Sequence, residues 1–257
     1  MILWLTDLLA DLLAAFMLLT RLPLARFASV GMSAELARCV WAFPIVGVVV
    51  GGLGGLIYWL AHRLGMPALL AAVWTLAATT IATGALHDDG LADTADGFGG
   101  GATPARKLEI MRDSHIGSYG ALALLLSVVV RAAAVAALGG PLRVMLVLCL
   151  SGMLGRGGIL VVLLAVRPAR DDGLGAAIGN AGTLRGAVGL ALAIVATLLA
   201  LPMLSAIAIM AAALLASLTV ARLAHGQIGG YTGDVLGAVE VITECVVLTT
   251  AATVFGG

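Results

Sequence analysis

Long apolar segments alternate with polar ones along this chain, and the lengths of the apolar segments predict membrane-spanning helices. A helix rises 1.5 Å per residue, so about 20 apolar residues cross the roughly 30 Å hydrocarbon layer of a bilayer. Seven segments approach or reach this length: residues 40–60, 67–86, 118–138, 143–166, 187–201, 203–223 and 237–254. The pattern predicts an all-α fold, a polytopic transmembrane helical bundle with about seven spans.

The first 20 residues form a further apolar segment, which carries two carboxylates. Asp7 and Asp11 are four positions apart and therefore lie on one face of a helix. Such a helix either spans the membrane or lies amphipathically in the interface with both carboxylates turned to water, and the sequence leaves both open. In the next segment Gly47, Gly51 and Gly55 recur at every fourth position. That spacing predicts close packing against a neighbouring helix backbone.

Composition indicates that lipid is the main solvent of this protein. Of its residues 61% are hydrophobic and 11% charged, and the mean hydropathy is +1.13. Soluble domains are about 45–50% apolar and about 25% charged. We therefore expect one integral-membrane catalytic domain over residues 1–257, in contact with the bilayer, whose small-residue helices also permit a homo-oligomer. The formal net charge is zero, which argues against a nucleic-acid partner.

The loops between the apolar segments differ in length and charge. Four long polar loops cover residues 21–39, 87–117, 167–186 and 224–236, whereas short ones lie near 61–66, 139–142 and 202. Ten arginine and lysine residues lie in or beside the long loops, and two lie in or beside the short ones. Basic residues accumulate on the cytoplasmic side. We therefore expect a multi-pass protein of the bacterial inner membrane, with its long, active-site loops in the cytoplasm.

The densest group of acidic residues lies in the second long loop. Residues 87–97 read His-Asp-Asp-Gly-Leu-Ala-Asp-Thr-Ala-Asp-Gly, which spaces Asp89, Asp93 and Asp96 by four and then three positions. On a helix this spacing aligns three carboxylates along one stripe. Their mutual repulsion would be relieved by a divalent cation, and carboxylate oxygens suit Mg²⁺. Magnesium in turn predicts phosphoryl or nucleotidyl chemistry.

Two other polar clusters supply further candidates. Residues 106–115 contain side chains suited to phosphate binding or proton transfer, namely Arg106, Lys107, Arg112, Asp113 and His115. The segment that begins at Gly229 contains Thr232 and Asp234 and is followed by Glu240 and Glu244 at the start of an apolar span. Ionisable side chains at that depth are costly and therefore functional suspects. Arg156 is another, inside an apolar run.

Together these segments resemble the cobalamin synthase family, the adenosylcobinamide-GDP ribazoletransferases. The resemblance runs in order along nearly the whole chain, through residues 19–23, 43–47, 86–97, 109–114, 173–175 and 229–238. The acidic motif and Thr-Gly-Asp at 232–234 are its most specific parts. The family commonly has an apolar residue where Asp88 stands, so Asp89, Asp93 and Asp96 inherit the metal-binding role and Asp88 does not. Glu244 matches the family position better than Glu240.

The resemblance implies a magnesium-dependent reaction of two substrates. Adenosylcobinamide-GDP and α-ribazole, or its 5′-phosphate, would give adenosylcobalamin, or its phosphate, and GMP. Asp89, Asp93 and Asp96 would hold the metal, and Arg112 would bind phosphate, with Arg106, Lys107, Arg156, Thr232 and Asp234 as further substrate-binding candidates. Asp113 or Glu244 would take the hydroxyl proton, with His87 or His115 as alternatives.

Two other functional classes fit parts of the pattern. A CDP-alcohol phosphotransferase also uses an aspartate-rich helix, but its Asp-Gly-x-x-Ala-Arg run is not matched, because Asp93 follows Ala92 here. A cation transporter would place its carboxylates near the bilayer centre, whereas the acids here gather at one border of the spans.

Overall fold

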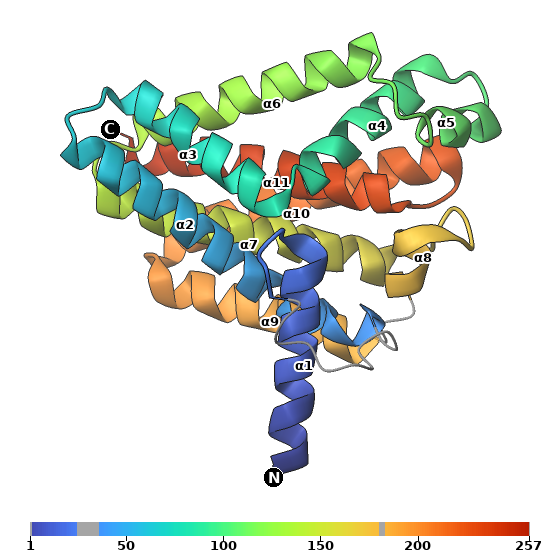
Figure 1. Ribbon diagram of the computed structural model, residues 1–257, viewed down its shortest axis with the longest axis horizontal. Coiled ribbons are helices and arrows are strands. Elements are labelled where there is room, and N and C mark those ends of the chain that lie inside the picture. Colours follow the sequence, from blue (N-terminus) through green and yellow to red (C-terminus); the bar gives the residue numbers. More distant parts are fainter. Residues whose placement is uncertain (1, 25–35, 180–182, 257) are drawn as a thin grey trace.

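The computed structural model describes residues 2–24, 36–179 and 183–256, which form a bundle of helices (Figure 1). Part of the loop predicted at 21–39 lies outside these residues. The elements in chain order are α1 (Ile2–Leu19), the 3₁₀ helix η3 (Leu36–Ala42), α2 (Phe43–Arg63), α3 (Ala68–Thr83), α4 (Leu86–Gly100), α5 (Pro104–Ile110), α6 (Ser118–Ala137), α7 (Pro141–Ala165), α8 (Gly173–Gly179), α9 (Thr183–Ala200), α10 (Met203–Ile228) and α11 (Gly233–Phe255).

The predicted membrane bundle is confirmed, with one correction to its spans. Six helical stretches among the described residues are long and apolar enough to cross a bilayer: Leu36–Arg63, α6, α7, α9, α10 and α11. The stretch predicted at 67–86 is not a complete span by itself. It corresponds to α3, which qualifies only together with α4, and the two helices meet at a 91° bend. The acidic segment, predicted as part of a long loop, is therefore a helix that follows α3 at a sharp bend, as in a broken span or a re-entrant segment.

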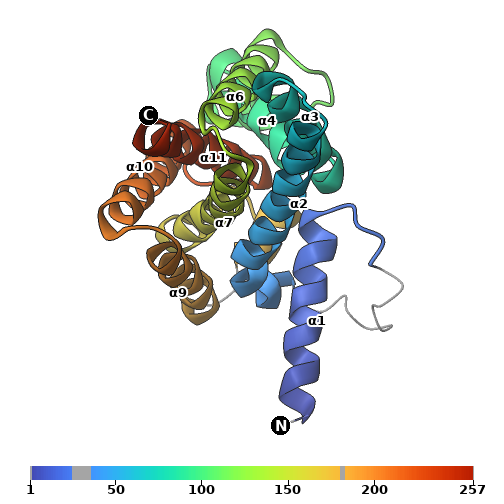
Figure 2. The same ribbon diagram turned by 90° about the vertical axis from the view of Figure 1, so that its left-hand side faces the viewer.

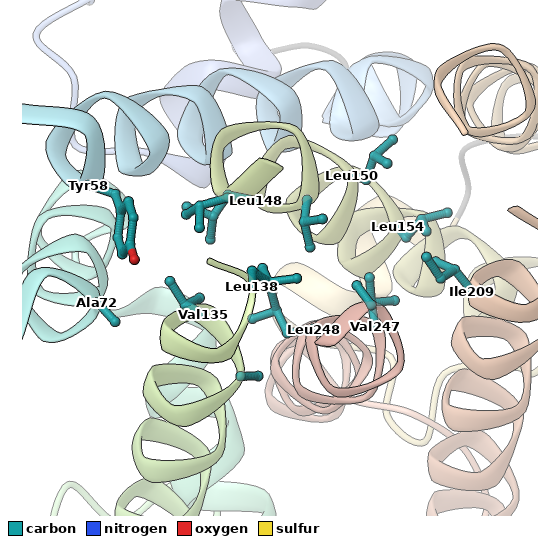
Figure 3. Packing of buried hydrophobic residues seen from close by; sticks show 14 of the residues in the cluster. Tyr58, Ala72, Val135, Leu138, Leu148, Leu150, Leu154, Ile209, Val247 and Leu248 are labelled. Atoms are coloured by element: carbon teal, nitrogen blue, oxygen red, sulfur yellow. The ribbon is translucent and has the colours of Figure 1, made fainter. Parts of the chain in front are cut away.

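Glycines determine how closely α2 packs against α7. A Cβ atom on Gly47 or Gly51 would overlap the backbone of Gly152 or Leu148, and one on Gly55 would lie 2.7 Å from the Cα of Met145. Only a residue without a side chain permits this approach, so the packing role predicted for the glycine stripe is confirmed. Around this pair a buried cluster joins α2, α3, α6, α7, α9, α10 and α11, and Figure 3 shows part of it.

The N-terminal helix α1 is oriented differently from the bundle. Figures 1 and 2 both show it running across the direction that α6, α7 and α10 roughly share. Asp11 faces η3, where its carboxylate lies 3.4 Å from the Arg38 guanidinium and accepts a 3.3 Å hydrogen bond from the Trp41 indole. The crosswise orientation fits an interfacial helix better than a spanning one.

Neighbouring glycines allow a matched test of the α2–α7 contact. We expect Gly51→Ala to lower the free energy of unfolding by about 1–3 kcal/mol, because the new methyl group overlaps α7 backbone. At Gly52 a Cβ would meet only the Cys149 Sγ at 3.7 Å. Gly52→Ala should therefore be neutral or slightly stabilising, since alanine is the better helix former. Thermal unfolding of the purified variants would measure both, and equal losses of stability would contradict the assignment.

Candidate active site

The break between α3 and α4 sets the position of the acidic helix. Two consecutive residues, Gly84 and Ala85, adopt left-handed backbone conformations with φ of 65° and 58°. The N–H groups of Gly84 and Ala85 donate to the carbonyls of Ile81 and Thr80, which ends α3. Left-handed conformations are uncommon for residues other than glycine. Ala85 thus marks a tightly determined turn, from which α4 starts in a new direction.

Helix α4 lies directly on the first turns of α11. A Cβ on Gly90 would lie 2.7 Å from the carbonyl oxygen of Asp234, and one on Gly237 would lie 3.1 Å from the carbonyl oxygen of His87. Two glycines on facing helices therefore bring the backbones together. As a result Asp89 and Asp234, which are far apart in sequence, line the same space.

That space is a cavity of about 150 Å³ between α4, α8 and α11. Its charged lining consists of Asp89, Asp234 and Arg170, together with the buried imidazole of His87. The rest of the wall is mainly apolar and comes from α1, α2, α4, α7, α8 and α11, through Leu18, Leu19, Phe43, Leu86, Ile159, Leu174, Ile178 and Leu236. An apolar pocket with a few converging polar groups is the usual form of a small-molecule site.

Two loops hold Arg170 at this cavity. The N–H of Tyr231 donates to the Arg167 carbonyl at 3.1 Å, and the N–H of Ala169 donates to the Tyr231 carbonyl at 2.8 Å. The segment after α7 is thereby tied to the segment before α11, and the Arg170 guanidinium lies 3.6 Å from the Asp234 carboxylate. Thr232, predicted to bind substrate, instead caps α11 in this structure, because its hydroxyl accepts the Val235 N–H.

The three aspartates of the predicted metal motif have different environments. Asp89 is exposed and lines the cavity, whereas Asp93 is half-buried. Asp96 is buried, and its two oxygens accept the N–H groups of Gly117 and Gly120 at 2.7 and 2.9 Å. These amides belong to the start of α6, whose first N–H groups have no partner within the helix. Asp96 therefore caps α6 and joins it to α4.

The carboxylates at this site could hold magnesium only if other ligands complete its coordination shell. Among the described residues no three His, Cys, Asp or Glu side chains converge into a metal-binding group. However, the negative charges of Asp89, Asp234 and Asp96 all act on Asp93. This concentration of negative charge favours a divalent cation. Magnesium usually binds through one or two carboxylates plus phosphate oxygens and water, which is the kind of donor set available here.

Behind α4 lies a buried network of ion pairs. Arg156 contacts the Glu240 carboxylate at 2.7 Å, with side chains only 1% and 4% exposed. Arg131 contacts Asp88 at 2.6 Å. Glu244 lies 3.6 Å from Arg131 and 3.8 Å from Arg156. Arg156 and Glu244, both predicted site residues, thus belong to this ion-pair network and do not line the cavity.

His87 links this network to the cavity. Its Nδ1 lies 3.6 Å from a Glu240 carboxylate oxygen, and its Nε2 is buried without a hydrogen-bond partner among the described residues. The residue lines the cavity on one side and a small polar space of the ion-pair network on the other. Among the proton acceptors predicted from the sequence, His87 is the one that lines the cavity.

The predicted cluster at 106–115 lies outside the cavity, and its charged side chains pair with other residues of the protein. Arg106 contacts Glu109 at 2.8 Å, and Lys107 donates to the amide oxygen of Gln227. Both oxygens of Asp172 accept hydrogen bonds from Arg112, at 2.9 and 2.7 Å.

Within the same cluster Asp113 and His115 form a pair of their own. The Asp113 carboxylate lies 2.6 Å from the His115 Nδ1. This hydrogen bond raises the pKa of His115 and lowers the pKa of Asp113. Neither residue lines the cavity.

Sequence reasoning missed two parts of the site. Arg170 was counted only as a basic loop residue, although the Asp171-Asp172-Gly173 turn beside it signals an ordered loop. The apolar wall was missed because its residues come from separate helices and each resembles ordinary core. Asp88, which the acidic motif left without a role, is explained by its ion pair with Arg131.

Comparisons with known proteins agree with the resemblance. The profile of the family described as "Cobalamin-5-phosphate synthase" matches residues 11–252. A protein of Bradyrhizobium diazoefficiens named "Adenosylcobinamide-GDP ribazoletransferase" is 45% identical over 96% of this chain and 94% of its own length. Proteins of the same name from Azorhizobium caulinodans and Mesorhizobium japonicum are 44% and 41% identical, covering 92% and 96% of this chain and 92% and 94% of their own lengths. No solved structure matches the chain.

The buried pair of Arg156 and Glu240 should contribute strongly to stability. We expect Arg156→Met to lower the free energy of unfolding by about 3–5 kcal/mol, because it leaves Glu240 buried beside Glu244 with one cation fewer. Arg156→Met/Glu240→Met should recover most of this loss, since an apolar pair replaces the ionic one.

A surface pair provides the control for this measurement. Arg106→Met breaks an ion pair of similar length whose side chains are 58% and 68% exposed, and it should leave the free energy of unfolding nearly unchanged. Denaturant unfolding of the purified proteins would give all three values. Similar costs for the two single substitutions would show that the buried network does not stabilise the bundle.

Proposed function

The chain belongs to the cobalamin-5-phosphate synthase family, and we propose that it transfers adenosylcobinamide phosphate from adenosylcobinamide-GDP to α-ribazole or its 5′-phosphate. The 3′-hydroxyl oxygen of the ribazole forms a bond to the phosphorus that carries the aminopropanol arm. The bond from this phosphorus to the bridging oxygen breaks, GMP leaves with that oxygen, and the hydroxyl proton is released. The product is adenosylcobalamin or its 5′-phosphate.

One observation supports this proposal above the others: the cavity where Asp89, Asp234 and Arg170 meet. The residues come from two segments of the family's motif, 86–97 and 229–238, and from the loop after α7. Two carboxylates and one guanidinium beside an apolar wall suit a diphosphate reacting with the hydroxyl group of a nucleoside. Arg170, rather than the surface residues Arg106, Lys107 and Arg112, is then the cation nearest to the reacting phosphate.

Asp89 and Asp93 are the proposed magnesium ligands, in a site completed by phosphate oxygens of the donor. Their spacing of four positions places them on one face of α4. When bound, magnesium would neutralise charge that develops on the phosphates and on the leaving GMP. Asp96 belongs to the same motif, and its contacts with the α6 amides give it a second role, in holding α4 in place.

The hydroxyl proton has two proposed acceptors at the cavity. Asp234 lies at the start of α11 and is oriented by hydrogen bonding to the Thr232 hydroxyl. His87, which also lines the cavity, is the alternative. The other predicted acceptors, Asp113, His115 and Glu244, do not line it.

The proposed sidedness follows from the basic loops. Arg170 lies in one of the long basic segments and the acidic helix leads into another, and ten basic residues lie in or beside these segments. The positive-inside rule places such loops in the cytoplasm. We therefore propose that the cavity opens toward the cytoplasmic face of a bacterial inner membrane, where GTP-derived donors are made.

Substitution of the two proposed ligands tests the metal site. Asp89→Asn and Asp93→Asn should each reduce GMP release from adenosylcobinamide-GDP and α-ribazole by at least about a hundredfold, because each removes a charge needed to hold magnesium. Both proteins should remain in the membrane fraction. Asp7→Asn, which changes a largely exposed carboxylate of α1, is the control and should keep full activity.

Other results of this assay would overturn parts of the proposal. Near-full turnover in both aspartate variants would exclude the metal site. Release of CMP from CDP-diacylglycerol by the wild-type protein, without release of GMP from the corrinoid donor, would favour a CDP-alcohol phosphotransferase.

A further inference from the structure

We propose that the 150 Å³ cavity binds the base of the acceptor nucleoside, with the ribose directed toward Asp89 and Asp234. This inference rests on the proposed function and deepens it, because it assigns one of the two substrates to a defined part of the site. The base of α-ribazole is 5,6-dimethylbenzimidazole, a flat bicyclic aromatic group with two methyl substituents.

The distribution of polar and apolar groups in the cavity supports this assignment. Five buried apolar side chains from five different elements form its wall: Leu19, Phe43, Ile159, Ile178 and Leu236. The charged groups lie next to one another, because Arg170 contacts Asp234 and the residue after Asp89 packs on the Asp234 backbone. A ligand with an apolar body and one polar end fits this division.

The volume of the cavity fits the acceptor base but is too small for the corrinoid. Pockets for drug-sized ligands measure about 300–1,000 Å³, so a cavity of about 150 Å³ holds only a fragment of a substrate. A corrin ring with its peripheral amides is larger than a drug-sized ligand and must stay outside. The corrinoid therefore reaches the site with its phosphate arm, while a bicyclic base fits inside.

The apolar wall of the cavity suits the acceptor base better than guanine, the other bicyclic group in the reaction. Guanine carries several N–H and C=O groups, and burying such groups without hydrogen-bond partners is unfavourable. The leucine, isoleucine and phenylalanine side chains of the wall offer no such partners, and the lining supplies a single buried polar side chain, His87. Dimethylbenzimidazole has one free ring nitrogen once it is joined to ribose, and its methyl groups gain from burial.

A cavity-filling substitution tests this assignment. Ile178 is buried in α8 and lines the cavity. We expect Ile178→Phe to raise the KM for α-ribazole at least about tenfold, the scale on which apolar pockets discriminate small size differences. The KM for adenosylcobinamide-GDP should stay within about twofold. Leu199→Phe, at an exposed position of α9, is the matched control and should change neither value.

The acceptor can be varied as well as the protein. Benzimidazole riboside, which lacks both methyl groups, should be a poorer acceptor than α-ribazole for the wild-type protein. With Ile178→Phe this preference should shrink or reverse, because the new ring occupies the space of the methyl groups. A general loss of folding or activity would lower both acceptors equally, and would not produce this change of preference.

A binding measurement keeps this inference separate from the proposed function. Calorimetric titration of α-ribazole into the protein in lipid nanodiscs needs no turnover, and Ile178→Phe should weaken binding at least about tenfold. Weakened use of the donor with unchanged α-ribazole binding would overturn the inference and assign the cavity to guanine or the corrinoid arm. If the wild type binds α-ribazole in this way but releases no GMP, the proposed reaction fails while the binding site stands.

Discussion

A buried arginine in an apolar bundle needs a carboxylate beside it, and this requirement organises the helices around the site. Arg131 of α6 and Arg156 of α7 are paired with Asp88 of α4 and Glu240 of α11, and Glu244 lies between the two arginines. Unpaired, any of these charges would be far more costly at this depth. The pairs therefore connect four helices, and they hold the polar helix α4 against the core with Asp89 turned to the cavity.

Much of the fold could be predicted from the sequence, because the length of an apolar segment is a local property. The spans α6, α7, α9, α10 and α11 were predicted in this way. The close packing of α2 was predicted from the four-residue spacing of Gly47, Gly51 and Gly55. The broken span was not predicted, because nothing in the apolar run 67–86 shows where its axis turns. The turn depends on the left-handed backbone of Gly84 and Ala85, and on the later helices that receive α4.

The candidate site was predicted in its residue types more than in its arrangement. Spacing places Asp89, Asp93 and Asp96 on a common helical stripe. It does not reveal that the Gly117 and Gly120 amides donate hydrogen bonds to Asp96. Arg170 could not be assigned either, since its position depends on hydrogen bonds between two loops about 60 residues apart in sequence. Pairing between distant segments is a tertiary property, which a single sequence without relatives does not display.

The contact between Gly90 and Gly237 has a consequence for the biosynthesis of this protein. Helix α4 is made before α11, the helix on whose surface it packs. Chains fold as they emerge, from the N-terminus onward. Four further spans, α6, α7, α9 and α10, are therefore made between the acidic helix and α11. The cavity is therefore completed only once α11 is in place, and a chain that stops before α11 lacks Asp234, Leu236 and Gly237 from the cavity lining.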